Sequence, residues 1–304
     1  MLKKATYLYL LPLLLLLLAP VLVIIILAGK PPVESSAAAK GTNNPQQKAD
    51  VYYEDQVYHL PAEIAASVDT LNQSAKHPAT STIRLPILLY HYIEPINPKD
   101  RLRASLTVTP EKFAEQLALI KQANYESVTI SQVALLLAST TAKEKKIALT
   151  FDDGYRDFYQ YAFPLLQKYK IRATIYVIYD AINSPAYLSE QMIREMLASG
   201  LVEIGSHALD HKKLTSLSEA EAKRQIFLSK KMFEERFKTP IDTFAYPYGS
   251  FNQLIADRAK SAGYKAAVSV IPGEKQAEAN RYFLFRIRSS DQGGGTLLKR
   301  LLLN

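Results

Sequence analysis

The sequence contains no cysteine and no tryptophan among its 304 residues, and only five histidines. Without cysteine, disulfide bonds, thiolate metal sites and cysteine nucleophiles are excluded. Without tryptophan, tyrosine has to supply any aromatic surface on which a ligand stacks. A hydrophobic fraction of 48% and a charged fraction of 22% exclude a wholly disordered chain. The length predicts one large domain or two small ones.

Nearly all of the formal net charge of +8 lies at the two ends of the chain. Residues 1–50 hold five lysines against two acidic residues, and residues 281–304 hold five basic residues against one aspartate. The long segment between them is therefore nearly neutral. A nucleic-acid partner requires a clustered basic face on the domain itself, so we expect no nucleic-acid binding.

An uncharged run of 25 residues, 5–29, follows Lys3 and Lys4. As a helix rising about 1.5 Å per residue, this run would extend roughly 37 Å, which is enough to cross a bilayer. We therefore expect residues 1–30 to be an uncleaved single-pass membrane anchor, with the rest of the chain on the extracellular side. A cleaved signal peptide is the alternative, although its apolar region is usually about 7–15 residues long.

Residues 31–84 are predicted to be a linker and an amino-terminal extension. The first part, 31–50, is rich in Pro, Ser, Ala, Asn and Gln and is typical of a flexible tether. An apolar and aromatic cluster in 51–58 and a short helix over 61–71 are expected to pack on the main domain, which we place at 85–304. We expect the protein to be a monomer.

Short apolar runs alternate with segments of helical period from residue 85 onward. Helix starts are predicted at Thr109-Pro110 and at Ser218, and helix ends at Gly200 and Gly263. Strands that alternate with helices predict an α/β fold with a mainly parallel sheet, either open or closed into a barrel. In both architectures the active site lies at the carboxyl ends of the strands. The apolar runs are 85–91, 128–130, 147–151, 173–179, 202–204, 243–246, 266–270 and 283–287.

Polar residues follow two of these runs in a pattern typical of a metal site. Asp152 and Asp153 follow 147–151, and His207 and His211 follow 202–204. Adjacent carboxylates repel each other unless a cation neutralises one of them, and histidines four residues apart face the same way on a helical turn. One aspartate and two histidines form a site with open positions, as found with Zn²⁺ or Fe²⁺. The second aspartate would then be free to act as a base.

Each motif alone also has a structural interpretation. Asp-Asp-Gly is most often a turn, and a histidine pair at this spacing most often lies on a solvated helix face. Their joint occurrence at strand ends favours the functional interpretation. A metalloprotease would share the histidine spacing, but it needs a glutamate directly after the first histidine, where this sequence has Ala208.

Four segments of the sequence together resemble the polysaccharide deacetylases of carbohydrate esterase family 4. Residues 148–155 (ALTFDDGY) resemble the first motif of that family, and 204–211 (IGSHALDH) resemble its second. The third motif is similar to 244–249 (FAYPYG) in its Pro-Tyr-Gly part, and 88–91 (LLYH) resembles the opening strand of members that act on poly-N-acetylglucosamine. The resemblance implies a distorted (β/α) barrel, often with seven strands.

The resemblance also implies a role for each matching residue. Asp153, His207 and His211 would bind a divalent metal, most readily Zn²⁺, with Co²⁺, Ni²⁺ or Fe²⁺ as alternatives. Asp152 would be the general base that deprotonates the attacking water. The backbone N–H of Tyr248 would hold the oxyanion formed from the acetamide carbonyl. The reaction implied is amide hydrolysis on an N-acetylated sugar, which releases acetate.

The sequence departs from the family pattern at two positions. The family usually has an arginine, paired with the catalytic aspartate, where this chain has Ala245, and no histidine follows His211 to protonate the leaving amine. Residues 280–288 instead resemble the carboxyl-terminal segment of the biofilm-polymer branch, and we hypothesise that Arg286 is the partner of Asp152. His91 is the candidate general acid, with a structural histidine under the site as the alternative.

Tyrosines are expected to crowd the mouth of the site. We predict that substrate contacts Tyr92, Tyr155, Pro247 and Tyr248, with sugar rings stacked on the aromatic faces. Tyr90 is expected at the mouth as well. Tyr246 is interpreted either as a contact or as a core residue.

Two classes of function follow from these observations. The first is a membrane-anchored, metal-dependent deacetylase of an extracellular amino-sugar polymer. Poly-β-1,6-N-acetylglucosamine is the preferred substrate, ahead of peptidoglycan or chitin-like chains. The second is a catalytically weak carbohydrate-binding protein that retains the metal site, which the departures from the family pattern motivate.

Overall fold

The computed structural model describes residues 50–53, 56–59, 82–139 and 145–289. The predicted anchor, the tether and the predicted helix over 61–71 lie outside these ranges. Within them, no helix combines the length and the apolar character needed to span a bilayer. The proposed division of the chain at residues 30 and 84 remains a prediction.

Seven parallel strands close into a barrel, as the sequence predicted. An eighth strand, β7 (Glu126–Val128), pairs with the first half of β8 on the edge opposite β4. The ring of seven strands is closed because β8 pairs with β4, and this pairing excludes the open-sheet alternative. Around the ring the strands are β4 (Ile87–Tyr90), β14 (Leu284–Arg288), β12 (Ala266–Pro272), β11 (Thr243–Ala245), β10 (Val202–Ser206), β9 (Ala173–Val177) and β8 (Lys146–Phe151), which pairs again with β4.

The eight predicted apolar runs each overlap one of these eight strands. The largest difference is at 128–130, where the strand ends at Val128 and Ile130 begins a helix instead. Thr129 separates the two elements, because its backbone N–H donates to Gln132 Oε1 at 3.0 Å in the manner of a helix amino terminus. A short apolar run did not distinguish the end of a strand from the start of a buried helix.

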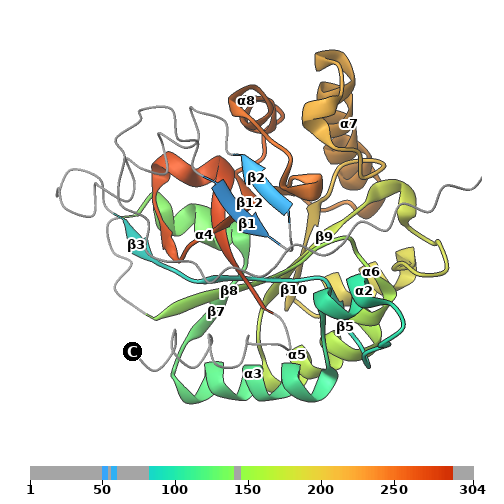
Figure 1. Cartoon of the computed structure of the whole chain (residues 1–304), viewed down its shortest axis with the longest axis vertical. Helices are drawn as coiled ribbons and strands as arrows, with labels where there is room; N and C mark the ends of the chain where they lie inside the picture. The colour runs from blue at the N-terminus through green and yellow to red at the C-terminus, as the bar shows by residue number, and fades with distance from the viewer. Residues whose placement is uncertain (1–49, 54–55, 60–81, 140–144, 290–304) are drawn as a thin grey trace, which may run out of the picture. The chain divides into compact units, whose positions relative to one another are not determined.

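Helices follow most of the strands and cover the outside of the barrel. Thr109 and Ser218 accept hydrogen bonds from the backbone three residues on, so both predicted helix starts are confirmed. Gly200 and Gly263 follow helices with φ of 68° and 87°, which confirms both predicted ends. The helices are α2 (Arg101–Leu106), α3 (Pro110–Gln122), α4 (Ile130–Leu137), α5 (Phe163–Tyr169), α6 (Glu190–Ala198), α7 (Glu219–Phe237) and α8 (Gln253–Ser261). Helices α3 and α5 lie side by side, as do α7 and α8 (Figure 1).

Smaller elements complete the described part of the chain. Three two-stranded pairs are β1 (Asp50–Tyr53) with β2 (Gln56–His59), β3 (Ile83–Arg84) with β13 (Lys275–Gln276), and β5 (Tyr92–Ile93) with β6 (Thr107–Val108). The expected packing of the β1–β2 segment on the main domain remains a prediction. Short helical turns are η1 (Phe158–Ala162), η2 (Tyr179–Ala181), η3 (Leu214–Ser216), η4 (Pro247–Gly249) and η5 (Glu278–Phe283).

Helix α4 packs against the amino end of the barrel. Its buried face joins apolar residues from the first halves of several strands in one hydrophobic cluster. Glu203, the second residue of β10, accepts the Ser131 N–H of α4 at 3.2 Å and the Thr243 hydroxyl at 3.0 Å. The amino end is thus closed by a helix, which leaves the carboxyl end for a site. The cluster includes Ile130, Val133, Ala134 and Leu137 of α4 with Ile87, Ala148, Val268 and Leu284 of the strands.

Candidate metal and catalytic site

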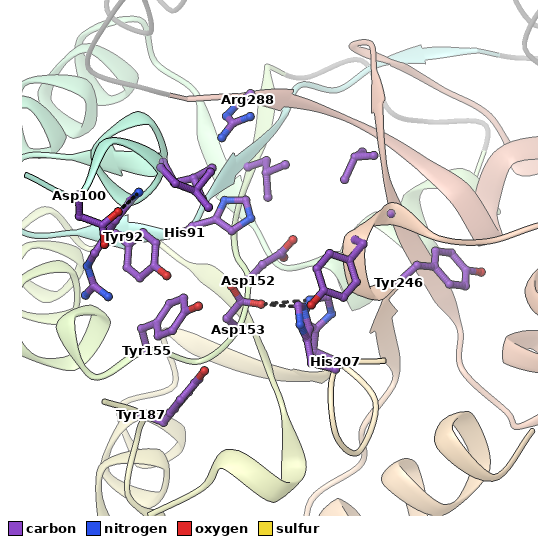
Figure 2. A pocket seen from close by; sticks show the side chains of 18 residues that line it. His91, Tyr92, Asp100, Asp152, Asp153, Tyr155, Tyr187, His207, Tyr246 and Arg288 are labelled. Carbon is purple, nitrogen blue, oxygen red and sulfur yellow. Dashed lines mark hydrogen bonds and ion pairs between the residues drawn. The ribbon is translucent and has the colours of Figure 1, made fainter. Parts of the chain in front are cut away.

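A pocket of about 540 Å³ opens at the carboxyl end of the barrel. Most of the predicted site residues line it, and they come from loops that follow four different strands (Figure 2). The prediction that chemistry lies just after the apolar runs placed the pocket correctly. The predicted residues that line it are His91, Tyr92, Asp152, Asp153, Tyr155, His207, His211, Tyr246 and Tyr248.

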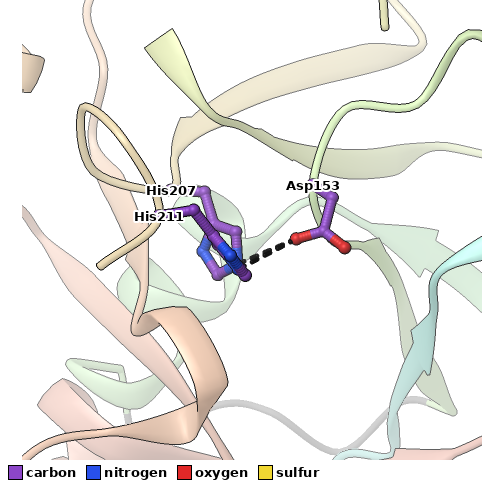
Figure 3. A group of neighbouring side chains, drawn as sticks. All are labelled: Asp153, His207 and His211. Carbon is purple, nitrogen blue, oxygen red and sulfur yellow. Dashed lines mark ion pairs between the residues drawn. The ribbon is translucent and has the colours of Figure 1, made fainter. Parts of the chain in front are cut away.

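Asp153, His207 and His211 form a compact cluster in this pocket (Figure 3). Asp153 Oδ1 lies 3.3 Å from His207 Nε2 and 3.2 Å from His211 Nε2. His207 Nδ1 donates to the carbonyl oxygen of Ala245 at 2.8 Å, so Nε2 is the ring nitrogen that could bind a metal once it is deprotonated. Burial raises the pKa of Asp153, but hydrogen bonds from the two imidazoles outweigh it and bring the pKa well below its usual range.

The two histidines are held by a loop and not by the helical turn that the sequence predicted. Ala208 and His211 have φ of 63° and 60°, so the chain turns twice through the left-handed region between them. Asp153 also has a positive φ, of 73°. Such conformations cost energy and persist where the surrounding structure enforces them, often at functional sites. The spacing of four residues brought the imidazoles together by a different backbone path from the one expected.

The donor set of this cluster fits a divalent metal. Ligand atoms about 2.0–2.2 Å from an ion lie about 2.8–3.6 Å apart when their bond angles at the ion are roughly 90–110°. Both measured oxygen-to-nitrogen distances, 3.2 and 3.3 Å, fall in this range. Two imidazole nitrogens and one carboxylate suit zinc, iron, cobalt and nickel better than magnesium or calcium.

Asp152 and Arg286 form a bidentate ion pair beside the cluster. The two guanidinium nitrogens Nη1 and Nη2 each lie 2.8 Å from a carboxylate oxygen, and Arg286 Nε donates to Ser269 O at 2.7 Å. The arginine is fully buried and Asp152 is 4% exposed. Burial raises the pKa of Asp152, but the charge and hydrogen bonds of Arg286 outweigh it and leave the pKa below its ordinary value. The carboxylate is therefore ionised at neutral pH.

His91 lies across the pocket from the histidine loop (Figure 2). Burial lowers its pKa, and the negative charges of Asp153 and Asp152 oppose that effect without reversing it. Arg288, from the end of β14, also lines the pocket and lowers the pKa of His91 further. The side chain thus lines the pocket, and its role as general acid or as structural histidine stays a prediction.

The described chain matches known proteins over its barrel. Residues 139–267 match the family model for polysaccharide deacetylase. YxkH of Bacillus subtilis (strain 168), which carries the name of a polysaccharide deacetylase, is 33% identical over 214 residues. That match covers 70% of this chain and 74% of YxkH. The chain belongs to the polysaccharide deacetylase family.

Two further relatives support this assignment. The poly-β-1,6-N-acetyl-D-glucosamine N-deacetylase of Staphylococcus aureus (strain MSSA476) is 28% identical over 207 residues, which cover 64% of this chain and 71% of that protein. The structure of the deacetylase PplD from Streptococcus pyogenes, in complex with acetate, superposes with a TM-score of 0.68 at 29% identity. It covers 73% of this chain and 99% of PplD. The protein is accordingly a polysaccharide deacetylase, and Asp153, His207 and His211 are its candidate metal site.

Tyr248 and Pro247 of this deacetylase lie on the turn η4, directly after β11. Tyr248 has φ of 58° and is 56% exposed, and its ring centroid lies 4.4 Å from that of His211. Pro247 is buried, and it does not line the pocket. The left-handed backbone of Tyr248 was not predicted from the sequence, where Gly249 is the residue that tolerates this conformation best.

Tyr90 and Tyr246 are core residues of the deacetylase. Tyr90 is 1% exposed and its hydroxyl donates to Gln116 Oε1 at 2.8 Å, so the expectation that it lies at the mouth is wrong. Tyr246 is also 1% exposed and donates to Tyr282 O at 2.7 Å, which supports the core interpretation. Both belong to the larger hydrophobic cluster between the strands and the outer helices.

Sequence reasoning missed several residues of the pocket. Tyr187 follows β9 and Arg103 lies on α2, and both line the pocket with Asp100 and Arg288. The rule that loops after strands build the site applies to Tyr187 as well as to the aspartates. Its distance of ten residues from the end of β9, however, gave no sign that the loop returns to the site.

Proposed function

We propose that the protein is a metal-dependent hydrolase that removes N-acetyl groups from an extracellular amino-sugar polymer. Poly-β-1,6-N-acetylglucosamine is the preferred substrate, because a relative that is 28% identical carries that activity in its name. Peptidoglycan and chitin-like chains are the next candidates. The observation that carries the proposal is the cluster of Asp153, His207 and His211 beside an arginine-paired Asp152 in one pocket.

Asp153, His207 and His211 would hold the metal, with Zn²⁺ as the proposed ion. A divalent cation bound there would act as a Lewis acid on the acetyl carbonyl and on the attacking water. Asp152 is placed to take a proton from that water, because Arg286 keeps its carboxylate ionised and fixes both oxygens. Arg286 is thus a positioning residue, and it takes the role of the family arginine whose position is occupied here by Ala245.

The remaining groups serve the later steps of the hydrolysis. We assign the backbone N–H of Tyr248 as a donor to the oxyanion. We assign His91 as the group that protonates the leaving amine, since it faces Asp152 and Asp153 across the pocket. Because burial lowers the pKa of His91, its neutral imidazole would first take up the proton that Asp152 receives from water and would then pass it to the departing amine. The products are acetate and a free amino sugar.

The location of the enzyme is part of the proposal. The uncharged run 5–29 behind two lysines supports a single-pass anchor, with the barrel on the extracellular side, where the polymer lies. A cleaved amino terminus would give a secreted form of the same enzyme. We propose that it acts as a monomer.

Acetate release from a panel of N-acetylated polymers tests this function. The panel is poly-β-1,6-N-acetylglucosamine, peptidoglycan and chitin oligomers, each with Zn²⁺, with Co²⁺ and after chelation. We expect poly-β-1,6-N-acetylglucosamine to release acetate when metal is present and not after chelation. His207→Ala should lose both its activity and its bound metal. Asp152→Asn should lose activity but keep its metal. Binding of polymer without acetate release by the wild-type protein would instead support the carbohydrate-binding alternative.

A further inference from the structure

Three tyrosines form a row along one side of the pocket. The ring centroids of Tyr92 and Tyr155 are 4.3 Å apart, and those of Tyr155 and Tyr187 are 5.0 Å apart, with interplanar angles of 27° and 28°. The three come from the segments that follow β4, β8 and β9, with Tyr92 in the short strand β5. Figure 2 shows their hydroxyls pointing to the side of Asp153. The row therefore presents an edge of hydroxyls to the reaction centre.

The faces of the three rings differ in what covers them. Tyr155 is the middle member, so both of its faces meet another tyrosine. Tyr92 is only 8% exposed, and the guanidinium of Arg103 lies 4.0 Å from its ring centroid. Sugar stacking on these two rings, which the sequence analysis expected, finds no open face. Tyr187 ends the row, and among the described residues it has no second ring or cation contact.

The loop that carries Tyr187 is fixed to the loop that carries Asp153. Leu188 N donates to Gly154 O at 3.0 Å, and Arg156 N donates to Ala186 O at 2.9 Å. These two hydrogen bonds flank the bridge between Tyr155 and Tyr187. Because Gly154 directly follows Asp153, the ring of Tyr187 is held at a constant offset from the metal cluster. A ring fixed in this way loses little conformational freedom when a ligand stacks on it.

We propose that the outer face of Tyr187 is the stacking surface for the sugar unit next to the one that is deacetylated. The hydroxyls of Tyr155 and Tyr92 then donate to the reacting sugar. This proposal rests on the proposed function and extends it to a second sugar subsite. It makes the enzyme prefer oligomers of two or more units over the monosaccharide.

The hydroxyl edge has the chemistry for this role. A phenol carries one O–H donor and also accepts hydrogen bonds, so the hydroxyls of Tyr92 and Tyr155 can both bond to the polar groups of a sugar. An aromatic face at the end of the row supplies the apolar contact that the axial hydrogens of a pyranose need. The row thus combines polar contacts at one unit with stacking at the next.

A tryptophan probe tests the contact directly. Because the chain has no tryptophan, Tyr187→Trp in an Asp152→Asn background places a single indole at the proposed subsite. We expect its emission to change on titration with β-1,6-linked N-acetylglucosamine oligomers of two to five units, and to respond weakly to the monosaccharide. Tyr161→Trp in the same background is the matched control, since Tyr161 is exposed and does not line the pocket. An equal response from both probes, or none at position 187 while calorimetry detects binding, would overturn the proposal.

Kinetics provide the second measurement. Tyr187→Ala should raise KM for the pentamer about three- to ten-fold with kcat changed by less than two-fold, and Tyr187→Phe should restore KM. An unchanged KM in Tyr187→Ala, with acetate still released, would refute the stacking contact and leave the proposed function intact. If the wild-type protein released no acetate from any polymer, the proposed function would fail, and the tryptophan titration would still test sugar binding at Tyr187.

Discussion

The two ends of the barrel each hold a carboxylate in a very different setting. At the carboxyl end, both oxygens of Asp152 meet the guanidinium of Arg286 at 2.8 Å. At the amino end, Glu203 is held by the Thr243 hydroxyl and by the backbone N–H and hydroxyl of Ser131, and no cation pairs with it among the described residues. The pKa of Asp152 is lowered despite its burial, whereas burial raises that of Glu203 despite its hydrogen bonds.

The difference shows that the hydrogen-bond or ion-pair partner of a buried carboxylate affects its charge state, and so its role, more than burial does. A cation keeps Asp152 ionised and fixed, as a base requires. Neutral donors at the amino terminus of α4 suit Glu203 to anchoring that helix, since a helix amino terminus carries partial positive charge and unpaired N–H groups. We therefore assign Asp152 to the reaction and Glu203 to the fold.

Matched amide substitutions at the two ends give the largest expected contrast. Asp152→Asn should lower kcat/KM for acetate release by about 10²- to 10⁴-fold, because the amide cannot take the proton from water. Glu203→Gln should change kcat/KM by less than about three-fold at 25 °C. Circular dichroism of both variants at the assay temperature is the control for folding. Equal losses of activity in the two folded variants would contradict the division between the ends.

Removing the guanidinium of Arg286 is a second test of the same division between the two ends of the barrel. Arg286→Met keeps an unbranched side chain but leaves Asp152 buried without its partner, so the free energy of unfolding should fall by about 3–5 kcal/mol. Because the base also loses its orientation, kcat/KM should fall with it. The double variant Arg286→Met/Asp152→Asn should recover part of the stability, since no unpaired charge remains. Full activity in folded Arg286→Met would refute the positioning role.

Much of this arrangement could be predicted from the sequence, because it depends on local pattern. Apolar runs placed the eight strands of the main sheet, and the rule that sites lie at the carboxyl ends of strands brought Asp152, Asp153 and His207 to one pocket. The Arg286 hypothesis combined the place of that residue in the last run with the family arginine that is missing at Ala245. Apart from that family comparison, these inferences depend on periodicity or on the position of a residue within an element.

The features that escaped prediction depend on contacts between distant segments. The left-handed backbone at Ala208 and His211 is enforced by the surrounding structure, because neither residue favours it intrinsically. Tyr187 enters the site only because its loop hydrogen-bonds back to Gly154. Glu203 lies within an apolar run, and nothing local shows that a helix more than 70 residues earlier in the chain meets it.

Asp157 separates the effect of the partner from the effect of location. It lies at the same end as Asp152 but lacks a cation partner: Oδ2 accepts from Ile93 N at 2.6 Å, and Oδ1 has no hydrogen-bond partner among the described residues. Burial raises its pKa from 3.8 to about 7. If a cationic partner decides whether a buried carboxylate is ionised, the pKa of Asp157 should be raised like that of Glu203 and not lowered like that of Asp152.

The stability of the protein should therefore depend on pH through Asp157. The folded state holds its proton between about pH 4 and pH 7, so the stabilisation is complete below pH 4 and is lost as the pH rises through 7. The shift of about three units corresponds to at most roughly 4 kcal/mol. Asp157→Asn should gain stability relative to the wild type as the pH rises from 4.5 to 8 in urea denaturation. Parallel pH profiles for the two proteins would show that Asp157 is not protonated in the folded state.

The smallest expected effect is on stability at the amino end. In Glu203→Gln, the amide replaces one acceptor oxygen with a donor, so one of the Ser131 donors loses its partner and the free energy of unfolding should fall by about 1–3 kcal/mol. Thermal melting measures this loss. Glu235→Gln is the matched control, because Glu235 is exposed on α7 and its contact with Lys231 is 3.8 Å, so its substitution should change stability by less than about 0.5 kcal/mol. If Glu203→Gln had the same melting temperature as Glu235→Gln, Glu203 would not anchor α4, and its hydrogen bonds with the hydroxyls of Thr243 and Ser131 would need another explanation.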